Sequence, residues 1–201
     1  MKEKLLLITA LLLSTTSLNA HTGDTYWRIG MVTAITSIVA TNILGTTETS
    51  IDIGLDTDNK EISMTRFNFK WLMKEKRPFD NKFKLKVEIF NTVRLSKWQN
   101  IYSGINQDNI HLLDYAPVFR FTYDNKYLPY IELGTGVSIM SKQKIGNIDM
   151  GGKFAFNHTF GVGYKIFDFS ATAKIQHYSN NYIYDTNPGI NFYILNVGYK
   201  Y

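Results

Sequence analysis

The last eleven residues of the chain, NFYILNVGYKY (residues 191–201), alternate between two kinds of side chain. Every second residue from Tyr193 to Tyr201 is aromatic or aliphatic, whereas the residues between them are mainly polar or small. Successive side chains of a β-strand point to opposite faces, so this spacing predicts a strand with one apolar face and one mainly polar face.

The same period of two recurs in seven segments upstream, and polar turns separate them. The eight predicted strands cover residues 51–56, 66–71, 84–94, 115–122, 131–139, 153–165, 169–176 and 193–201. An even number of alternating strands with no domain linker between them favours a single all-β fold with antiparallel neighbours.

The composition narrows the class of protein. The chain has 201 residues, no cysteine and a net charge of +5. Disulfides and thiolate chemistry are therefore excluded, and the small basic excess does not favour nucleic acid as a partner. Thirteen tyrosines and thirteen phenylalanines without long apolar strand runs are typical of membrane β-barrels, whose interfaces carry aromatic girdles.

The N-terminus has the order of a secretory signal peptide: a charged start, an apolar run at residues 5–13, and a polar stretch ending at Ala20. The apolar run is shorter than the roughly 20 residues of a transmembrane helix. We predict a signal peptide at residues 1–20, a segment of unknown role at residues 21–48, and a barrel at residues 49–201. Residues 21–48 fit an extra strand, an interfacial helix or a plug.

In a soluble β-protein the polar face of each strand would point outward. Predicted export, long strands and a final aromatic residue favour the opposite arrangement, in which the apolar faces point outward to lipid. The ending on Tyr201 resembles the C-terminal signal by which outer-membrane barrels are recognised for insertion. We predict an eight-stranded antiparallel transmembrane β-barrel in the bacterial outer membrane, because closure leaves no unpaired strand edge in lipid. Side chains fill so narrow a barrel. The cations expected inside are Arg66, Lys70, Lys84, Lys86, Arg94, Arg120, Lys153 and Lys174, with Asp52, Asp56, Glu88 and Glu132 as partners.

Three polar residues fall on the outward, apolar face of the last two strands: His177, Ser179 and Asn191. An antiparallel hairpin places His177 and Asn191 across from each other, and Ser179 shares their face. We predict Ser179 as nucleophile, His177 as general base, and Asn191 as the acceptor that orients the imidazole. Asn180 is the predicted oxyanion donor. The structural alternative is a polar strand end at a membrane interface.

Several motifs carry a family resemblance. They are HYSN (177–180), NPGIN (187–191), APVF (116–119), PYIELGTG (129–136) and FGVG (160–163). Together they resemble the lipid A 3-O-deacylases, the PagL-type enzymes, over about residues 49–201. The resemblance implies an eight-stranded outer-membrane barrel whose Ser-His-acid triad faces the lipid. It implies an esterase that removes the 3-O-linked acyl chain of lipid A, with His177 as base, Ser179 as nucleophile and Asn180 as oxyanion donor.

The chain departs from the family pattern at one position, because Asn191 stands where the best-known pattern has Glu. An amide orients the imidazole but lacks the full charge that stabilises imidazolium. Asp185 and His158 are weaker candidates: Asp185 fits a turn, and His158 has no hydroxyl two residues away. Basic residues near the rim, Lys142, Lys144 or Lys174, are weak candidates for contacts with lipid phosphates.

Two alternatives stay open at this point. One is a weakly active or inactive barrel of the same fold with a structural or interaction role, and the other is a phospholipase. The predicted partners are lipid A or lipopolysaccharide as substrate and the lipids of the outer membrane, with no nucleic acid. We predict no metal ion and no cofactor. The sequence leaves the oligomeric state open, and a homodimer is one alternative.

Overall fold

The computed structural model describes residues 45–58, 61–78, 84–101, 108–123 and 129–201. The predicted signal peptide, residues 1–20, and residues 21–44 of the predicted N-terminal segment lie outside these ranges. Among the described residues, no helix is long and apolar enough to cross a lipid bilayer.

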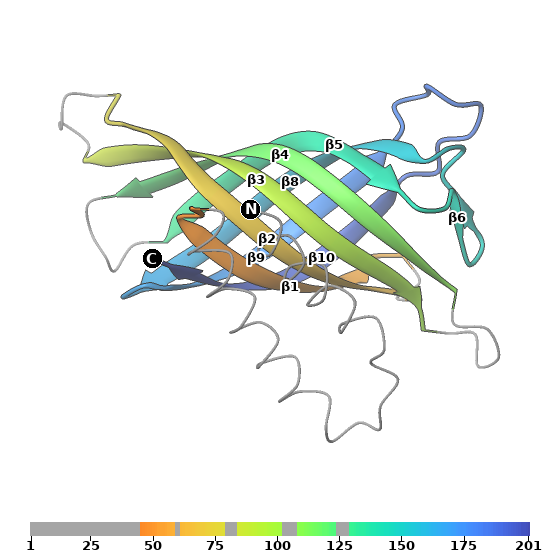
Figure 1. Ribbon diagram of the computed structural model, residues 1–201, viewed down its shortest axis with the longest axis horizontal. Coiled ribbons are helices and arrows are strands. Elements are labelled where there is room, and N and C mark those ends of the chain that lie inside the picture. The colour runs from red at the N-terminus through yellow and green to blue at the C-terminus, as the bar shows by residue number, and fades with distance from the viewer. Residues whose placement is uncertain (1–44, 59–60, 79–83, 102–107, 124–128) are drawn as a thin grey trace, which may run out of the picture. The chain divides into compact units, whose positions relative to one another are not determined.

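Eight antiparallel strands close a barrel in the order β1–β10–β9–β8–β5–β4–β3–β2 (Figure 1). They are β1 (Glu48–Asp56), β2 (Ile62–Lys76), β3 (Leu85–Asn100), β4 (Asn109–Tyr123), β5 (Tyr130–Met140), β8 (Phe154–Ile166), β9 (Phe169–Ser179) and β10 (Ile190–Lys200). Two short strands, β6 (Lys144–Ile145) and β7 (Ile148–Asp149), form a hairpin between β5 and β8. The predicted eight-stranded antiparallel barrel is confirmed.

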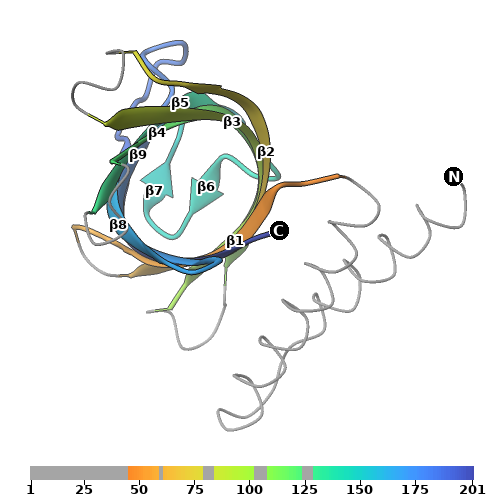
Figure 2. The ribbon, with the colours of Figure 1, turned by 90° about the vertical axis from the view of Figure 1, so that its left-hand side faces the viewer.

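The alternation read from the sequence matches the two faces of the barrel wall. Large apolar side chains such as Leu133, Phe160 and Leu195 are exposed on the outside, whereas their polar neighbours are buried inside. The β6–β7 hairpin was not predicted, because strands of two residues are too short to show a period. It lies at the end of the barrel away from the C-terminus, within the outline of the ring when viewed along the barrel (Figures 1 and 2).

One half of the interior is ionic; we call it the ionic half (Glu48, Asp52, Arg66, Lys70, Arg120, Glu132 and Lys174). Arg120 Nη1 lies 2.6 Å from Glu48 Oε2, and its Nε donates to Glu132 Oε1 at 2.7 Å. Lys70 Nζ lies 2.6 Å from Glu48 Oε1. Ion pairs of this kind offset the cost of burying each charge.

The ionic half includes six of the twelve charges that were predicted for the interior. Arg66 pairs with Asp52, as expected from their placement inside the wall. Lys84 and Lys153 are exposed instead of buried. Glu48 and Asp114 are buried acids that were not among those predicted for the interior, since each precedes the predicted start of its strand.

The other half of the interior is apolar; we call it the apolar half (Met64, Trp98, Ile110, Leu112, Met140, Ile145, Met150, Tyr178 and Phe192). All of these side chains are buried in one cluster. Trp98 packs edge-on against Tyr178 with ring centroids 4.7 Å apart and tilts against Phe192 at 4.9 Å. Ile145 and Met150 come from the β6–β7 segment, so this hairpin fills the barrel at that end.

Candidate active site

His177 and Asn191 face each other across β9 and β10. Nδ1 of His177 lies 2.8 Å from Oδ1 of Asn191, and both side chains are on the outer face of the barrel. An amide oxygen is only an acceptor, so Nδ1 carries the proton and Nε2 is left with its lone pair. Backbone pairing fixes Asn191 further, because its carbonyl accepts the Thr57 N–H at 2.9 Å. The structure thus brings together two of the predicted site residues.

Ser179 is the next outward residue of β9 after His177 and is half-buried. Two residues along a strand separate Cα atoms by about 6.6 Å, and both side chains then stand on the same face. With Nδ1 engaged by Asn191, Nε2 is the nitrogen that remains to accept a proton from the Ser179 hydroxyl. The structure therefore places the imidazole with its orienting acceptor, and Ser179 two residues along the same face of β9.

Tyr178, between the two, points inward and is fully buried. Its hydroxyl donates to Asp114 Oδ2 at 3.1 Å and accepts from Arg66 Nη1 at 3.0 Å. Its ring packs on Trp98 and Phe192 of the apolar half. The strand segment that presents His177 and Ser179 to the outside is therefore fixed from the inside.

Asn180 begins the loop after β9 and is fully buried. Its backbone N–H donates to Asn187 Oδ1 at 2.9 Å, and its side-chain amide donates to the carbonyls of Met150 and Thr186. Its Oδ1 accepts the Tyr182 N–H at 2.9 Å. The predicted oxyanion donor thus lies directly after Ser179, but in this conformation its donors hold the loop together.

Gly189 lies against the imidazole at the other end of this loop. Its φ is +63°, and a Cβ placed there would lie 3.0 Å from Cε1 of His177. A side chain at this position would be strained by the backbone and would also crowd the ring. Gly189 belongs to the NPGIN motif, but its contact with His177 depends on the folded loop and has no signal in the sequence.

His158 has a hydroxyl partner after all, although it comes from another strand. Its Nδ1 lies 3.0 Å from Oγ1 of Thr135 on β5, and His158 is the cross-strand neighbour of His177 on β8. The outward residues Thr135, His158, His177 and Asn191 therefore form one polar row across four strands. Spacing along one strand could not reveal this row, because its members are far apart in sequence.

The remaining predicted residues lie elsewhere. Asp185 is exposed in the loop between β9 and β10. Lys142 and Lys144 are exposed and pair with Asp108 and Asp149 at 3.1 and 3.0 Å. The Gly151 N–H, with Lys144, holds the pKa of Asp149 below its usual range. The rim position suggested for Lys174 is wrong, since this side chain is buried inside between Asp52 and Glu132.

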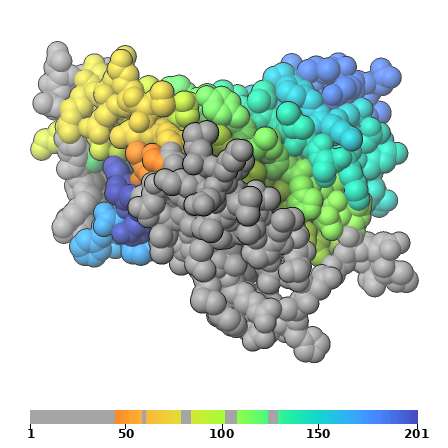
Figure 3. Space-filling model, in the orientation of Figure 1, coloured from red at the N-terminus to blue at the C-terminus, as the bar shows by residue number. Residues whose placement is uncertain are grey.

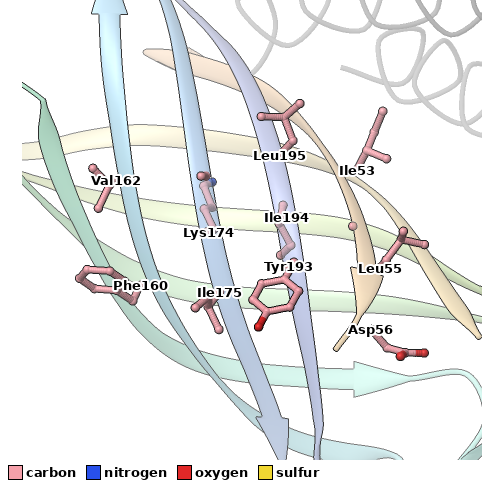
Figure 4. A pocket seen from close by; sticks show the side chains of 12 residues that line it. Ile53, Leu55, Asp56, Phe160, Val162, Lys174, Ile175, Tyr193, Ile194 and Leu195 are labelled. Atoms are coloured by element: carbon pink, nitrogen blue, oxygen red, sulfur yellow. The ribbon is translucent and has the colours of Figure 1, made fainter. Parts of the chain in front are cut away.

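An apolar groove of about 710 Å³ lies on the outer face directly beside the polar row. Figure 4 shows Phe160, Ile175 and Tyr193 side by side on β8, β9 and β10. In the next row of paired residues, the small Ala173 stands between Val162 and Leu195. The groove therefore lies over Ala173 and Ile175, and Ile175 stands between Ala173 and His177 on the outer face of β9.

Comparisons with known proteins concern the family and the fold. A family model described as Lipid A 3-O-deacylase (PagL) matches residues 64–200. Lipid A deacylase PagL of Pseudomonas aeruginosa is 33% identical over 87 residues, which are 42% of this chain and 50% of the relative. The chain thus matches about half the length of this curated relative.

A solved structure has the same fold. The crystal structure of the outer membrane enzyme PagL superposes with a TM-score of 0.65 at 22% identity, and the match covers 77% of this chain and 99% of that chain. At 22% identity this likeness shows the fold alone.

Proposed function

Because the chain belongs to the lipid A 3-O-deacylase family, we propose that it is an outer-membrane esterase that removes the 3-O-linked acyl chain of lipid A. The observation that carries the proposal is the placement of His177, Ser179 and Asn191 together on the outer wall of the barrel, beside an apolar groove. A hydrolase whose substrate is a membrane lipid needs its reactive groups on the lipid-facing surface. Most of the large side chains exposed on that surface are apolar, as membrane insertion requires.

The proposed reaction is acyl transfer in two steps. The Ser179 oxygen attacks the ester carbonyl while His177 Nε2 takes the hydroxyl proton, and the sugar oxygen leaves with that proton. The acyl chain is then esterified to Ser179. A water molecule, deprotonated by Nε2, attacks this ester and releases the fatty acid, and Ser179 regains its proton.

Asn191 would keep the imidazole in the tautomer that this reaction needs. Nδ1–H donates to the amide oxygen, so Nε2 is the nitrogen left to accept a proton. An amide carries no net charge and therefore stabilises the transient imidazolium less than a carboxylate does. The site is thus expected to be competent but slower than one with an acid at this position.

The oxyanion is proposed to form beside the loop that follows Ser179. The Asn180 N–H is the donor closest in sequence to the nucleophile, and it is held at 2.9 Å by the side-chain oxygen of Asn187. Donation to an oxyanion requires this N–H to exchange one acceptor for another. Removal of one donor in such a site typically lowers the rate by about 100–1000-fold.

The groove supports a lipid substrate over a soluble ester. Its outer lining is apolar and includes Phe160, Val162, Ile175, Tyr193 and Leu195. An acyl chain that lies in this groove, across Ala173 and Ile175, would have its carbonyl end toward the polar row that contains His177. The proposed partners are lipid A or lipopolysaccharide and the surrounding lipids, and a homodimer remains a separate alternative.

Mass spectrometry of lipid A from cells that express the protein tests the proposal. Wild type is expected to yield lipid A that lacks one acyl chain, and Ser179→Ala is expected to lower the rate by about 10⁴-fold or more. Ser63→Ala is a matched control, because Ser63 is also half-buried on an outward position but lies on β2. It should act as wild type.

Two outcomes would contradict the proposed reaction. Intact lipid A in cells with folded wild-type protein would favour a structural or interaction barrel. Release of fatty acid from glycerophospholipids, with lipid A unchanged, would favour a phospholipase.

A further inference from the structure

The segment after β7, residues 150–152, contacts the loop that follows Ser179; we call it the support segment. Figure 3 shows the β9–β10 loop, in blue, beside the cyan residues of the β5–β8 region at one end of the barrel. The side-chain amide of Asn180 donates to the Met150 carbonyl at 2.7 Å. The Met150 side chain itself is fully buried in the apolar half. One residue thus connects the loop to the barrel interior.

Two glycines allow the loop to approach this closely. A Cβ at Gly151, whose φ is +76°, would lie 2.6 Å from the Thr186 carbonyl oxygen. A Cβ at Gly152 would lie 2.2 Å from two ring carbons of Tyr184. Real Cβ contacts are never so short, so the loop backbone and the Tyr184 ring occupy the space that side chains would need.

The support segment is itself held on both sides. Met150 N–H donates to the Gln143 carbonyl at 2.9 Å, and the Gly151 N–H donates to Asp149 Oδ1 at 2.9 Å. The Met140 N–H donates to the Lys153 carbonyl at 2.7 Å, which joins the end of the segment to β5. The hairpin side chain Ile145 is fully buried beneath it. The segment is therefore a fixed surface and not a freely moving loop.

We propose that residues 150–152 position the nucleophile loop, and that Gly152 and Tyr184 are positioning residues for the reaction at Ser179. The inference rests on the proposed function. Neither residue touches the reacting atoms. Their contact holds the β9–β10 loop against residues 150–152. The loop in turn holds Asn180, which directly follows β9. The support segment thereby takes part in positioning the nucleophile, whereas the β6–β7 hairpin that precedes it fills the barrel.

The sharpest test is a double-mutant cycle of Gly152→Ala and Tyr184→Ala. Gly152 has an ordinary backbone conformation, and the three atoms nearest to an added methyl all belong to the Tyr184 ring. Gly152→Ala is expected to lower kcat at least tenfold with little change in KM, because the ring and the loop must move. In the Tyr184→Ala background the same methyl has space, so the double variant should equal Tyr184→Ala alone.

Gly146→Ala is the matched control. Gly146 lies in the same hairpin with φ +54°, and an added Cβ would meet only the amide end of Asn100, at 2.5 Å from its Nδ2. This variant strains the hairpin without touching the nucleophile loop and should retain wild-type kcat. If Gly146→Ala loses as much activity as Gly152→Ala, the effect does not come from the contact between Gly152 and Tyr184. A wild-type kcat in Gly152→Ala would also overturn the proposal.

Hydrogen exchange of residues 180–187 separates this inference from the proposed function. Gly152→Ala should speed exchange of the Asn180 N–H at least tenfold and leave the strand amides protected. If the wild type does not deacylate lipid A, the proposed function is wrong. The hydrogen-exchange measurement then still tests whether the support segment holds the loop. Unchanged exchange in Gly152→Ala would overturn the support segment even in an active enzyme.

Discussion

The two halves of the barrel interior hold the same wall together by different means. In the ionic half, Arg120 and Lys70 connect Glu48 on β1 with Glu132 on β5. In the apolar half, Trp98, Tyr178 and Phe192 pack as rings and hydrogen bonds are few. The candidate site lies on the wall of the apolar half, on the outer side of the strand that carries Tyr178.

The ionic half connects strands around the barrel, whereas the apolar half supports the strand that carries the candidate site. Buried ion pairs connect strands that are distant in sequence, and removal of one partner leaves a buried charge behind. Close-packed rings resist small displacements, because any gap loses contacts. We therefore expect changes in the ionic half to affect stability alone, and changes in the apolar half to affect catalysis as well.

The largest effect on stability is expected from Arg120→Met. The substitution leaves Glu48 and Glu132 buried without their guanidinium partner, so the free energy of unfolding should fall by about 3–5 kcal/mol. Urea-dependent folding into lipid vesicles measures this change. The folded fraction should keep the wild-type kcat. Lys97→Met, at an exposed site on the neighbouring strand β3, is the control and should change stability by less than about 0.5 kcal/mol. A fall in the kcat of folded Arg120→Met would remove the distinction between the two halves.

A smaller loss of stability is expected from Tyr178→Phe, together with a change in rate. The variant keeps the ring in the apolar half but leaves Asp114 and Arg66 without the hydroxyl, which should cost about 1–3 kcal/mol. Because Tyr178 lies between His177 and Ser179, kcat should also fall several-fold. Tyr164→Phe, on the exposed outer face of β8, should change neither quantity. An unchanged kcat with reduced stability would show that the inner anchor does not position the site.

The smallest effect is expected from Asn191→Asp, which alters only the outer face. The carboxylate keeps the shape of the amide and accepts from Nδ1–H in the same place, but it also stabilises imidazolium. We expect kcat to rise about tenfold, equivalent to about 1.4 kcal/mol, with unchanged stability. Steady-state rates on purified lipid A provide the measurement. A lower rate in Asn191→Asp would mean that the neutral amide is the group suited to this site.

Much of the fold was predictable because a barrel wall has a simple period. Alternation along each strand identified all eight strands and both of their faces, down to the outward positions of His177, Ser179 and Asn191. The β6–β7 hairpin was missed, since its strands are too short to have a pattern. The position of Glu48 in the first strand was missed too, because a single charge before an apolar run reads as a loop.

The candidate site was only partly predictable. The alternation of side chains along the last two strands placed His177 opposite Asn191, and the structure shows a hydrogen bond between them. Thr135 is 23 residues from His158, and Met150 is 30 residues from Asn180, so neither contact has a signal in local sequence. Likewise, only the folded loop shows that the donors of Asn180 are already engaged.

The sequence by itself determined which side chains stand on each face of each strand, because that depends only on counting residues by two. Tertiary structure decided which strands are neighbours, in what register they pair, and which loop rests on which turn. Those choices depend on ion pairs, ring packing and close backbone contacts between residues far apart in the chain. The row from Thr135 to Asn191 exists only because four strands pair in this register, and the contact of Gly152 with Tyr184 exists only because the β9–β10 loop folds onto the support segment.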